Sequence, residues 1–192
     1  MITNLADGAQ AFTSNVFLVR GERTVLIDAG SNFDVVAGIR DHVDALDALI
    51  LTHTHPDHIG NADAICETFD VETWGYDETH RAVDQTLSDG QEVLLGDGVF
   101  EAIFTPGHAT DHLCFYNEGD GILFAGDLIF ANGAVGRIDF AGGDGAALLA
   151  SVERIANEVR GTLQAFHPGH GPSVTTHVEN HIEMAQQAAR MV

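Results

Sequence analysis

The chain has 192 residues, 45% of them hydrophobic, which is enough for one globular domain that buries a core without disulfide bonds. Its 29 acidic residues outnumber eight basic residues, all of them arginine, and the formal net charge of −21 excludes nucleic acid as a partner because such a surface repels phosphate groups. The acidic residues are scattered along the chain, a pattern typical of adaptation to high salt, where screening shortens the range of self-repulsion, so we expect a halophilic source.

The N-terminal stretch MITNLADGAQ has neither the basic patch nor the apolar segment of an export signal. The two cysteines, Cys66 and Cys114, are interpreted as ordinary buried thiols of a cytoplasmic protein. No apolar run reaches the roughly 18–20 residues that span a bilayer, so no membrane partner is expected.

The first part of the chain alternates between short apolar segments and segments with helical spacing. Gly21-Glu22 is a turn signal between two alternating apolar runs, which predicts a hairpin. Strands that alternate with helices indicate an α/β layer arrangement. We expect a hairpin over 12–30, a helix over 32–44, a buried strand over 45–52, a loop over 52–58, a helix over 59–69 and a strand over 71–76.

The middle of the chain consists of predicted strands separated by Gly-Asp turns, and the last third returns to helix. Asp144 is a plausible N-cap because an aspartate at this position can accept hydrogen bonds from the first turn. Two halves that each run from strands to helix suggest two packed sheets with helices outside. We expect strands within 92–108 and 111–130, a helix over 143–160, a strand within 162–171 and a closing helix over 173–192.

The segment LILTHTHPDHIGN places His53, His55, Asp57 and His58 directly after the buried strand. Side chains two residues apart on an extended segment point the same way, so His53 and His55 can reach one ion. Pro56 turns the chain, which lets the other two face a second ion. A single histidine in a polar loop is usually only solvated, but three histidines and an aspartate at one strand end predict a metal site.

Three later segments also place a possible metal ligand at or near the end of a predicted strand. TPGH ends one strand with His108, and PGHG ends another with His170. Asp127 interrupts the apolar run ILFAGDLIF, where a charge is costly to bury unless it is paired or bound to metal. Taken alone, each of the histidines would more often be a hydrogen-bonded core residue.

These motifs, in this order, resemble the metallo-β-lactamase superfamily, and LIDAG at 26–30 resembles its first motif. The resemblance covers almost the whole chain. It implies an α/β fold, an αββα sandwich of two mixed β-sheets with helices on the outer faces and metals at one edge. We therefore expect a single domain over 1–192, without the separate C-terminal helical substrate domain of full-length glyoxalase II enzymes.

The resemblance also implies a ligand set for two divalent ions. The flavodiiron branch usually has glutamate at the position of His55, so this histidine favours the hydrolases. The second ion would be held by Asp57, with Asp127 bridging both ions. The family pattern assigns His53, His55 and His108 to the first metal, Asp57, His58 and His170 to the second, and Asp127 to both.

This donor set suits zinc better than magnesium or calcium, with iron or manganese as alternatives. Two ions roughly 3.5 Å apart would share a water and lower its pKa, and the hydroxide would attack a carbonyl carbon. Asp57 and Asp127 are the catalytic candidates in this scheme. No serine or cysteine triad is evident.

The segments GRIDFAGGD and HPGHGPSVT resemble the glyoxalase II-like group, which cleaves thioesters such as S-lactoylglutathione. Arg137 is the candidate for binding a substrate carboxylate, with a surface ion pair to Asp139 or Asp144 as the alternative. Asp28 is expected to support the ligand loop without touching the metal. Because the chain has no lysine, glutathione itself is disfavoured and a small hydroxyacyl-thiol ester is preferred.

Persulfide dioxygenase is the main alternative function, because this relative shares nearly all the motifs but uses a single non-haem iron to activate oxygen. An inactive binding member of the fold is disfavoured by the complete ligand set. An antibiotic hydrolase is disfavoured by the missing export signal, and a nuclease by the charge. The native metal, the exact thioester and the oligomeric state are left open by the sequence.

Overall fold

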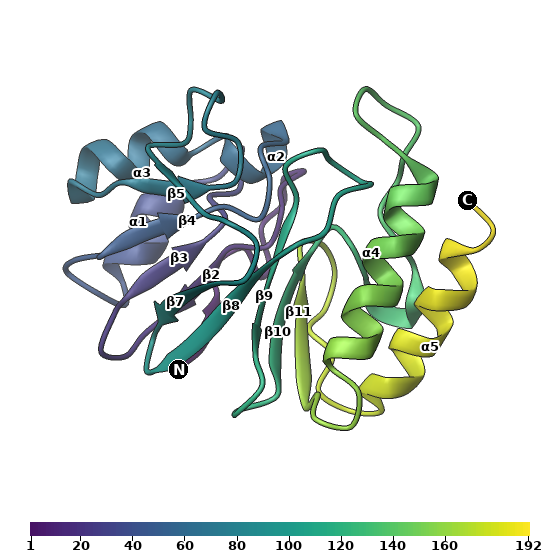
Figure 1. Ribbon diagram of the computed structural model, residues 1–192. Helices are drawn as coiled ribbons and strands as arrows, with labels where there is room; N and C mark the ends of the chain where they lie inside the picture. The colour runs from purple at the N-terminus through teal and green to yellow at the C-terminus, as the bar shows by residue number, and fades with distance from the viewer. The chain divides into compact units, whose positions relative to one another are not determined.

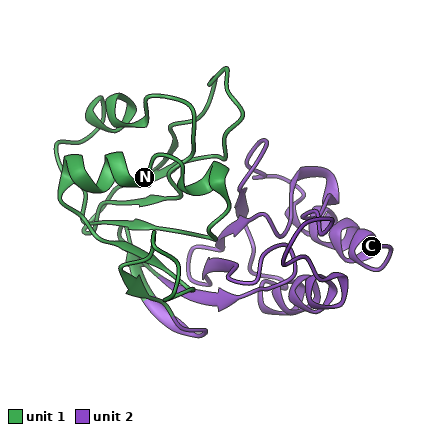
Figure 2. Ribbon diagram, turned by 90° about the horizontal axis from the view of Figure 1, so that it is seen from above, with its two compact units in different colours: residues 1–87, 93–99 green, residues 88–92, 100–192 purple.

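Two mixed β-sheets, five α-helices and one 3₁₀ helix make up the structure, a computed structural model that describes all 192 residues. The chain divides into two compact units, shown in different colours in Figure 2. Unit 1 comprises residues 1–87 and 93–99, and unit 2 comprises residues 88–92 and 100–192. The chain crosses from one unit to the other after Leu87, within β7 (Gln91–Leu95) and within β8 (Gly98–Phe104).

The sheet of unit 1 has six strands in chain order, β1 to β6. The first three are antiparallel neighbours and the later ones are parallel. Every residue of β2, β3 and β4 is buried, which explains their continuous apolar sequences. The strands are β1 (Ile2–Asn4), β2 (Phe17–Val19), β3 (Val25–Ile27), β4 (Ala48–Ile50), β5 (Thr73–Gly75) and β6 (Gln85–Thr86).

Two helices pack beside this sheet, α1 (Val35–Arg40) and α3 (Ala62–Phe69), and Figure 1 shows them close together. The Asp34 side chain caps α1 by accepting a hydrogen bond from the Ala37 N–H at 3.0 Å. Leu26 lies opposite Leu18 on one neighbouring strand and Leu49 on the other. These leucines form one core cluster with apolar residues of both helices, such as Val35, Ile39 and Ile65.

The second sheet has five strands in the order β11-β10-β9-β8-β7. Antiparallel pairing joins β8, β9 and β10, and β11 lies parallel to β10. The register of β10 and β11 shifts between Phe124 and Gly126, so the ladder is irregular at the end of β10. The strands are β7 (Gln91–Leu95), β8 (Gly98–Phe104), β9 (Leu113–Asn117), β10 (Ile122–Gly126) and β11 (Ala165–Pro168).

Two long helices, α4 (Gly145–Glu158) and α5 (Val178–Ala189), pack against each other in unit 2 (Figure 1). The Asp144 carboxylate caps α4 by accepting from the Ala146 and Ala147 N–H groups, as predicted. The 3₁₀ helix η1 (Ala131–Gly133) packs on α5. Buried residues of both helices join β9, β10 and β11 in one core cluster.

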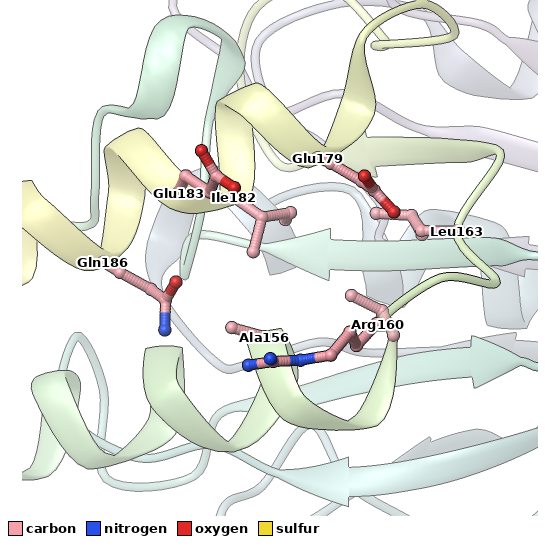
Figure 3. Close-up of a pocket in the computed structure, with 8 residues that line it drawn as sticks. Ala156, Arg160, Leu163, Glu179, Ile182, Glu183 and Gln186 are labelled. Atoms are coloured by element: carbon pink, nitrogen blue, oxygen red, sulfur yellow. The ribbon is translucent and has the colours of Figure 1, made fainter.

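A shallow groove runs between α4 and α5 (Figure 3). Its apolar floor includes Ala156, Leu163 and Ile182, and Arg160 and Glu183 are among its polar residues. Its volume of about 170 Å³ is below the roughly 300–1,000 Å³ of ordinary ligand sites. Neither histidine nor cysteine lines the groove.

The structure confirms the α/β class and the two mixed sheets. Most predicted strands and helices are present, although they are shorter than their apolar patterns. β1 and β6 were not predicted because ITN and QT are too short and too polar to stand out. None of the helices combines the length and apolar character needed to cross a membrane.

Candidate metal centre

The first group of predicted ligands follows β4 in unit 1, where α2 (Pro56–Ile59) forms a single helical turn. The prediction of a loop through His58 is wrong, because Pro56 occupies the first helical position, where its fixed φ suits a helix and its missing N–H breaks no bond. The His58 N–H closes the turn by donating to the His55 carbonyl at 2.9 Å. Asp57 and His58 therefore project from a helical turn.

Three imidazoles of unit 1 lie side by side. Nε2 of His53 is 3.1 Å from Nδ1 of His55, and the ring centroids of His53 and His58 are 4.0 Å apart. His53 and His58 are buried and His55 is half-buried. Two ligands bound tetrahedrally to one zinc ion at about 2.0–2.1 Å would stand roughly 3.4 Å apart. The facing nitrogens of His53 and His55 thus have nearly the separation of two ligands of a shared ion.

Asp28 supports this group from the end of β3. It is buried, and its backbone adopts a left-handed conformation with φ of 60°. Its Oδ2 lies 2.8 Å from Nδ1 of His58, and its Oδ1 accepts a hydrogen bond from the Thr52 N–H at 2.8 Å. Because an ionised carboxylate only accepts, Nδ1 of His58 carries the proton and Nε2 keeps the lone pair that a metal requires.

Thr52 extends the same network to His53. The Thr52 hydroxyl donates to Oδ2 of Asp28 at 2.8 Å, so its oxygen is left to accept from Nδ1–H of His53 at 3.1 Å. This arrangement puts the lone pair of His53 on Nε2, the atom that faces His55. One buried carboxylate therefore sets the tautomer of two predicted ligands.

Asp57 is half-buried, and the structure ties its backbone to the segment before β2. Its carbonyl accepts a hydrogen bond from the Ser14 N–H at 3.2 Å. This bond anchors the helical turn of α2, whereas the role of the Asp57 carboxylate rests on the family pattern.

In unit 2, His108 lies in the loop between β8 and β9 and is buried. Its Nδ1 is 2.8 Å from the Arg137 carbonyl oxygen. A carbonyl can only accept, so Nδ1 is protonated and the lone pair again lies on Nε2. The loop is held against α4, since the Asp144 N–H donates to the Gly107 carbonyl at 2.8 Å and the Ser151 hydroxyl donates to the Pro106 carbonyl at 2.7 Å.

Asp127, directly after β10, brings the two remaining histidines together. One oxygen of its carboxylate, Oδ2, lies 3.4 Å from Nε2 of His108 and 3.5 Å from Nε2 of His170. Both separations exceed the roughly 2.7–2.9 Å of a charge-assisted hydrogen bond. They match the roughly 3.4 Å expected between ligands of one ion, so the geometry suits a carboxylate shared between two imidazoles.

The loop that carries His170 follows β11, and the Gly169 N–H fastens it to the end of β10 by donating to the Gly126 carbonyl at 2.7 Å. Close packing around Asp127 depends on Gly136. A Cβ at this position would lie 2.1 Å from the Asp127 carbonyl oxygen and 2.8 Å from Cβ of His108. Only glycine lets the backbone pass close enough for the following carbonyl to reach His108.

Arg137, the predicted substrate-binding residue, forms an exposed bidentate ion pair with Asp139, with N–O distances of 2.9 and 2.7 Å. Hydrogen bonding to Asp139 raises the pKa of Arg137, and the same hydrogen bond lowers the pKa of Asp139. The guanidinium also lies over the Phe140 ring, 5.8 Å from its centroid. Phe140 in turn meets the His108 ring edge-on at 5.2 Å, a contact that the sequence analysis missed.

Two further histidines lie in the same unit. His112 is fully buried, and its Nε2 lies 3.0 Å from the Asp127 backbone nitrogen. His167 on β11 lies 2.8 Å from the Ser173 hydroxyl through Nδ1, and burial lowers its pKa to about 4. The sequence shows that His112 follows the TPGH motif closely, but it does not show that His112 contacts the backbone of Asp127.

Residues 9–184 match the pattern of the metallo-β-lactamase superfamily, so the chain belongs to this superfamily, which consists mostly of metal-dependent hydrolases. A hydroxyacylglutathione hydrolase from Enterobacter sp. (strain 638) is 35% identical over 133 residues, which cover 67% of this chain and 52% of that relative. The chain thus spans about half the length of the curated relative that it matches.

Solved structures show the same fold. TTHA1623, solved in a di-iron-bound form, is 28% identical with a TM-score of 0.74, and the match covers 91% of this chain and 94% of that one. ETHE1 from Myxococcus xanthus has a TM-score of 0.76 at 23% identity, over 99% of this chain and 90% of that one. The second likeness concerns the fold alone.

Proposed function

We propose that this protein is a dinuclear metal hydrolase that cleaves a small thioester of the hydroxyacyl-thiol type. The observation that supports this most directly is the position of one Asp127 oxygen at 3.4 and 3.5 Å from two imidazole nitrogens. Membership of the superfamily and the 35% identity to a hydroxyacylglutathione hydrolase point the same way.

The donor set fits divalent metals. Nε2 of His53, His58 and His108 keeps a lone pair because Nδ1 of each ring is engaged by an oxygen. Neutral imidazoles with few carboxylates favour zinc over magnesium or calcium, and iron or manganese could also bind. Each of the seven assigned ligands belongs to a group of three histidine or aspartate side chains that could hold a metal ion.

In the proposed site, seven side chains would hold the two ions, and Asp127 would be their shared ligand. When bound, the pair of ions would lower the pKa of a water molecule toward neutrality and polarise the substrate carbonyl. The first ion would be held by His53, His55 and His108, and the second by Asp57, His58 and His170.

The chain's own carboxylates orient this reaction. Asp127 would serve as a ligand of both ions, and the Asp57 carboxylate would accept a hydrogen bond from the attacking water. Water adds to the carbonyl carbon, the C–S bond breaks, and the products are a carboxylic acid and a thiol. A thiol has a pKa of about 8.5, so it leaves as a thiolate without a dedicated proton donor.

Neither cysteine competes with water as the nucleophile. Burial raises the pKa of Cys114 to about 12, and burial also raises the pKa of Cys66. Thiols with raised pKa values contain little thiolate at neutral pH and are poor nucleophiles. The nucleophile is therefore proposed to be water.

The proposed substrate is a thioester with a small thiol carrier. The net charge of −21 disfavours binding of a polyanionic carrier, and the guanidinium of Arg137 already has Asp139 as its partner. From the longer relative we therefore carry over only the class of reaction, thioester hydrolysis, and not its substrate.

The test is a hydrolysis assay in high salt with the protein reconstituted with zinc, iron or manganese. S-lactoyl esters of glutathione and of smaller thiols are compared by following thiol release. We expect hydrolysis with at least one small-thiol ester and two ions per chain by elemental analysis. Absence of hydrolysis from every ester and metal combination would refute the proposal.

Persulfide dioxygenase is the second candidate, because the sequence motifs resemble this class of enzyme nearly as closely as they resemble the glyoxalase II-like group. Oxygen consumption with a persulfide and one iron per chain would favour this alternative. Thiol release under anaerobic conditions would exclude it as the explanation of thioester turnover, since hydrolysis needs no oxygen.

A further inference from the structure

His112 has a buried imidazole ring. One of its nitrogens faces a backbone N–H and the other faces a threonine hydroxyl. Its Nε2 lies 3.0 Å from the backbone nitrogen of Asp127, and its Nδ1 lies 2.8 Å from the Thr105 hydroxyl. The ring has 0% exposure, and Thr105 is equally buried. His112 therefore contacts the backbone of the proposed bridging residue instead of a metal.

The Asp127 N–H needs such a partner because β10 ends irregularly. The register between β10 and β11 shifts at Gly126, whose φ of 48° turns the chain out of the strand. The flanking groups bond elsewhere: the Gly126 carbonyl accepts from Gly169, and the Leu128 N–H donates to the Ala125 carbonyl. A buried N–H without a partner is unfavourable, and the imidazole of His112 supplies the acceptor.

The hydrogen bonds determine the tautomer of His112. A backbone N–H can only donate, so Nε2 must hold a lone pair and Nδ1 must carry the proton. Nδ1–H then donates to the Thr105 oxygen, whose own hydroxyl points toward the Ile103 carbonyl at 3.5 Å or the Cys114 sulfur at 3.4 Å. Thr105 thus holds His112 in the form that accepts from Asp127.

We infer that His112 is a positioning residue for the bridging carboxylate. By fixing the backbone at Asp127, it keeps Oδ2 between the Nε2 atoms of His108 and His170, at 3.4 and 3.5 Å. Thr105 acts through His112. The inference rests on the proposed function, because the ions are what the positioned carboxylate would hold.

Two matched pairs of variants test it. His112→Leu removes the acceptor, whereas in His112→Gln the side-chain oxygen can occupy the place of Nε2. Thr105→Val removes the acceptor for Nδ1–H with little change in volume, whereas Thr105→Ser retains the hydroxyl. Each variant is prepared as the full chain, and the unfolding temperature of the metal-free form is recorded first.

The readouts are zinc affinity, by competition with a chelator, and the visible absorption spectrum of the cobalt-substituted protein, which reports ligand geometry. We expect His112→Leu to weaken the more loosely held ion about 10- to 100-fold and to alter the cobalt spectrum. His112→Gln should restore both toward wild type. Thr105→Val should change both in the same direction as His112→Leu, and Thr105→Ser should resemble wild type.

Wild-type zinc affinity and an unchanged cobalt spectrum in His112→Leu would overturn the inference, as would a His112→Gln protein that folds but binds no better than His112→Leu. If His112→Leu does not fold, the Thr105 pair decides in the same way. A wild-type protein that binds no ion would refute the proposed function and this inference together. A wild-type protein that binds two ions but hydrolyses no thioester would refute the proposed function alone.

Discussion

The Oδ2 atom of Asp28 lies 2.8 Å from Nδ1 of His58, although the two residues are 30 positions apart in the chain. The pair is buried, and Thr52 bonds to the same carboxylate through its N–H and its hydroxyl. This contact links the first motif of the sequence to the tautomer of a proposed metal ligand. The chemistry of the ligand group in unit 1 therefore depends on a residue outside the proposed ligand set.

Replacing Asp28 should weaken metal binding without removing a ligand. In Asp28→Asn, the amide can still accept from the Thr52 N–H, but the charge that holds the proton on Nδ1 of His58 is lost. We expect the affinity for zinc to fall about 10- to 100-fold, measured by chelator competition. Asp34→Asn, which alters an exposed helix cap of the same unit, is the control and should bind like wild type. Unchanged affinity in Asp28→Asn would contradict this role.

Asp127→Ala should abolish metal retention and thioester hydrolysis together, because both ions would lose the shared ligand. Elemental analysis after gel filtration measures the metals, and a variant that keeps two ions would show the bridging assignment to be wrong.

Asp127→Asn has an additional expected effect. Removing a buried charge should leave the metal-free variant at least as stable as the metal-free wild type, measured by thermal unfolding in EDTA.

His167 should make the metal-free fold sensitive to mild acid. Burial lowers its pKa from 6.5 to about 4, so between these values the unfolded chain binds a proton that the folded chain does not. Stability should therefore fall as the pH drops from about 6.5 to about 4, by up to about 3 kcal/mol.

The comparison is made in EDTA with His167→Asn, whose amide can still contact Ser173 but does not titrate. Wild type should lose more stability than this variant over that pH range, measured by chemical unfolding. His42→Asn, at an exposed position, is the control and should follow wild type. Parallel curves for wild type and His167→Asn would contradict the prediction.

High salt should stabilise the protein, because 29 acidic residues against eight basic ones repel one another. Raising the ionic strength from about 0.1 M to about 1 M shortens the screening length from about 10 Å to about 3 Å. We expect the unfolding temperature to rise steadily over this range in potassium chloride, whereas sucrose of equal osmolality should produce a smaller rise. An unfolding temperature independent of salt would contradict the halophilic interpretation.

Arg137→Gln should affect substrate binding more than folding. The Arg137–Asp139 pair is exposed on both sides, and such pairs contribute little to stability. If the guanidinium can exchange Asp139 for a substrate carboxylate, KM for a carboxylate-bearing thioester should rise several-fold while kcat changes less than about twofold. Asp139→Asn should lower KM for the same ester. Equal KM values in all three proteins would assign Arg137 to the surface ion pair only.

The sequence was informative wherever local chemistry decides the structure. Apolar runs marked the strands from β2 to β5, helical spacing marked α1, α3 and α4, and Asp144 marked the start of α4. The order of the histidine and aspartate motifs predicted the superfamily, which the match over residues 9–184 confirms. The division of the chain into domains and the assignment of each metal ligand stay predictions.

Other features could not be predicted from the local sequence, and some of them depend on partners far away in the chain. The helical turn at Pro56 was missed because proline disfavours a helix before it and favours one after it, and the sequence alone does not say which effect dominates. Strand β1 exists only because β2 lies beside it. Nothing in the sequence indicates that the ring of Phe140 contacts the ring of His108.

By itself, the sequence determined which side chains are available for metal binding and in which family they occur, because residue type and motif order are local properties. The tertiary structure decided which nitrogen of His53, His58 and His108 keeps its lone pair and what holds Asp127 in place. Those choices are made by hydrogen bonds that His58 donates to Asp28, that His108 donates to the Arg137 carbonyl and that the Asp127 N–H donates to His112. Such bonds join residues 15 to 30 positions apart, and a directional bond at 3 Å exists only once the folded backbone has brought its two ends together.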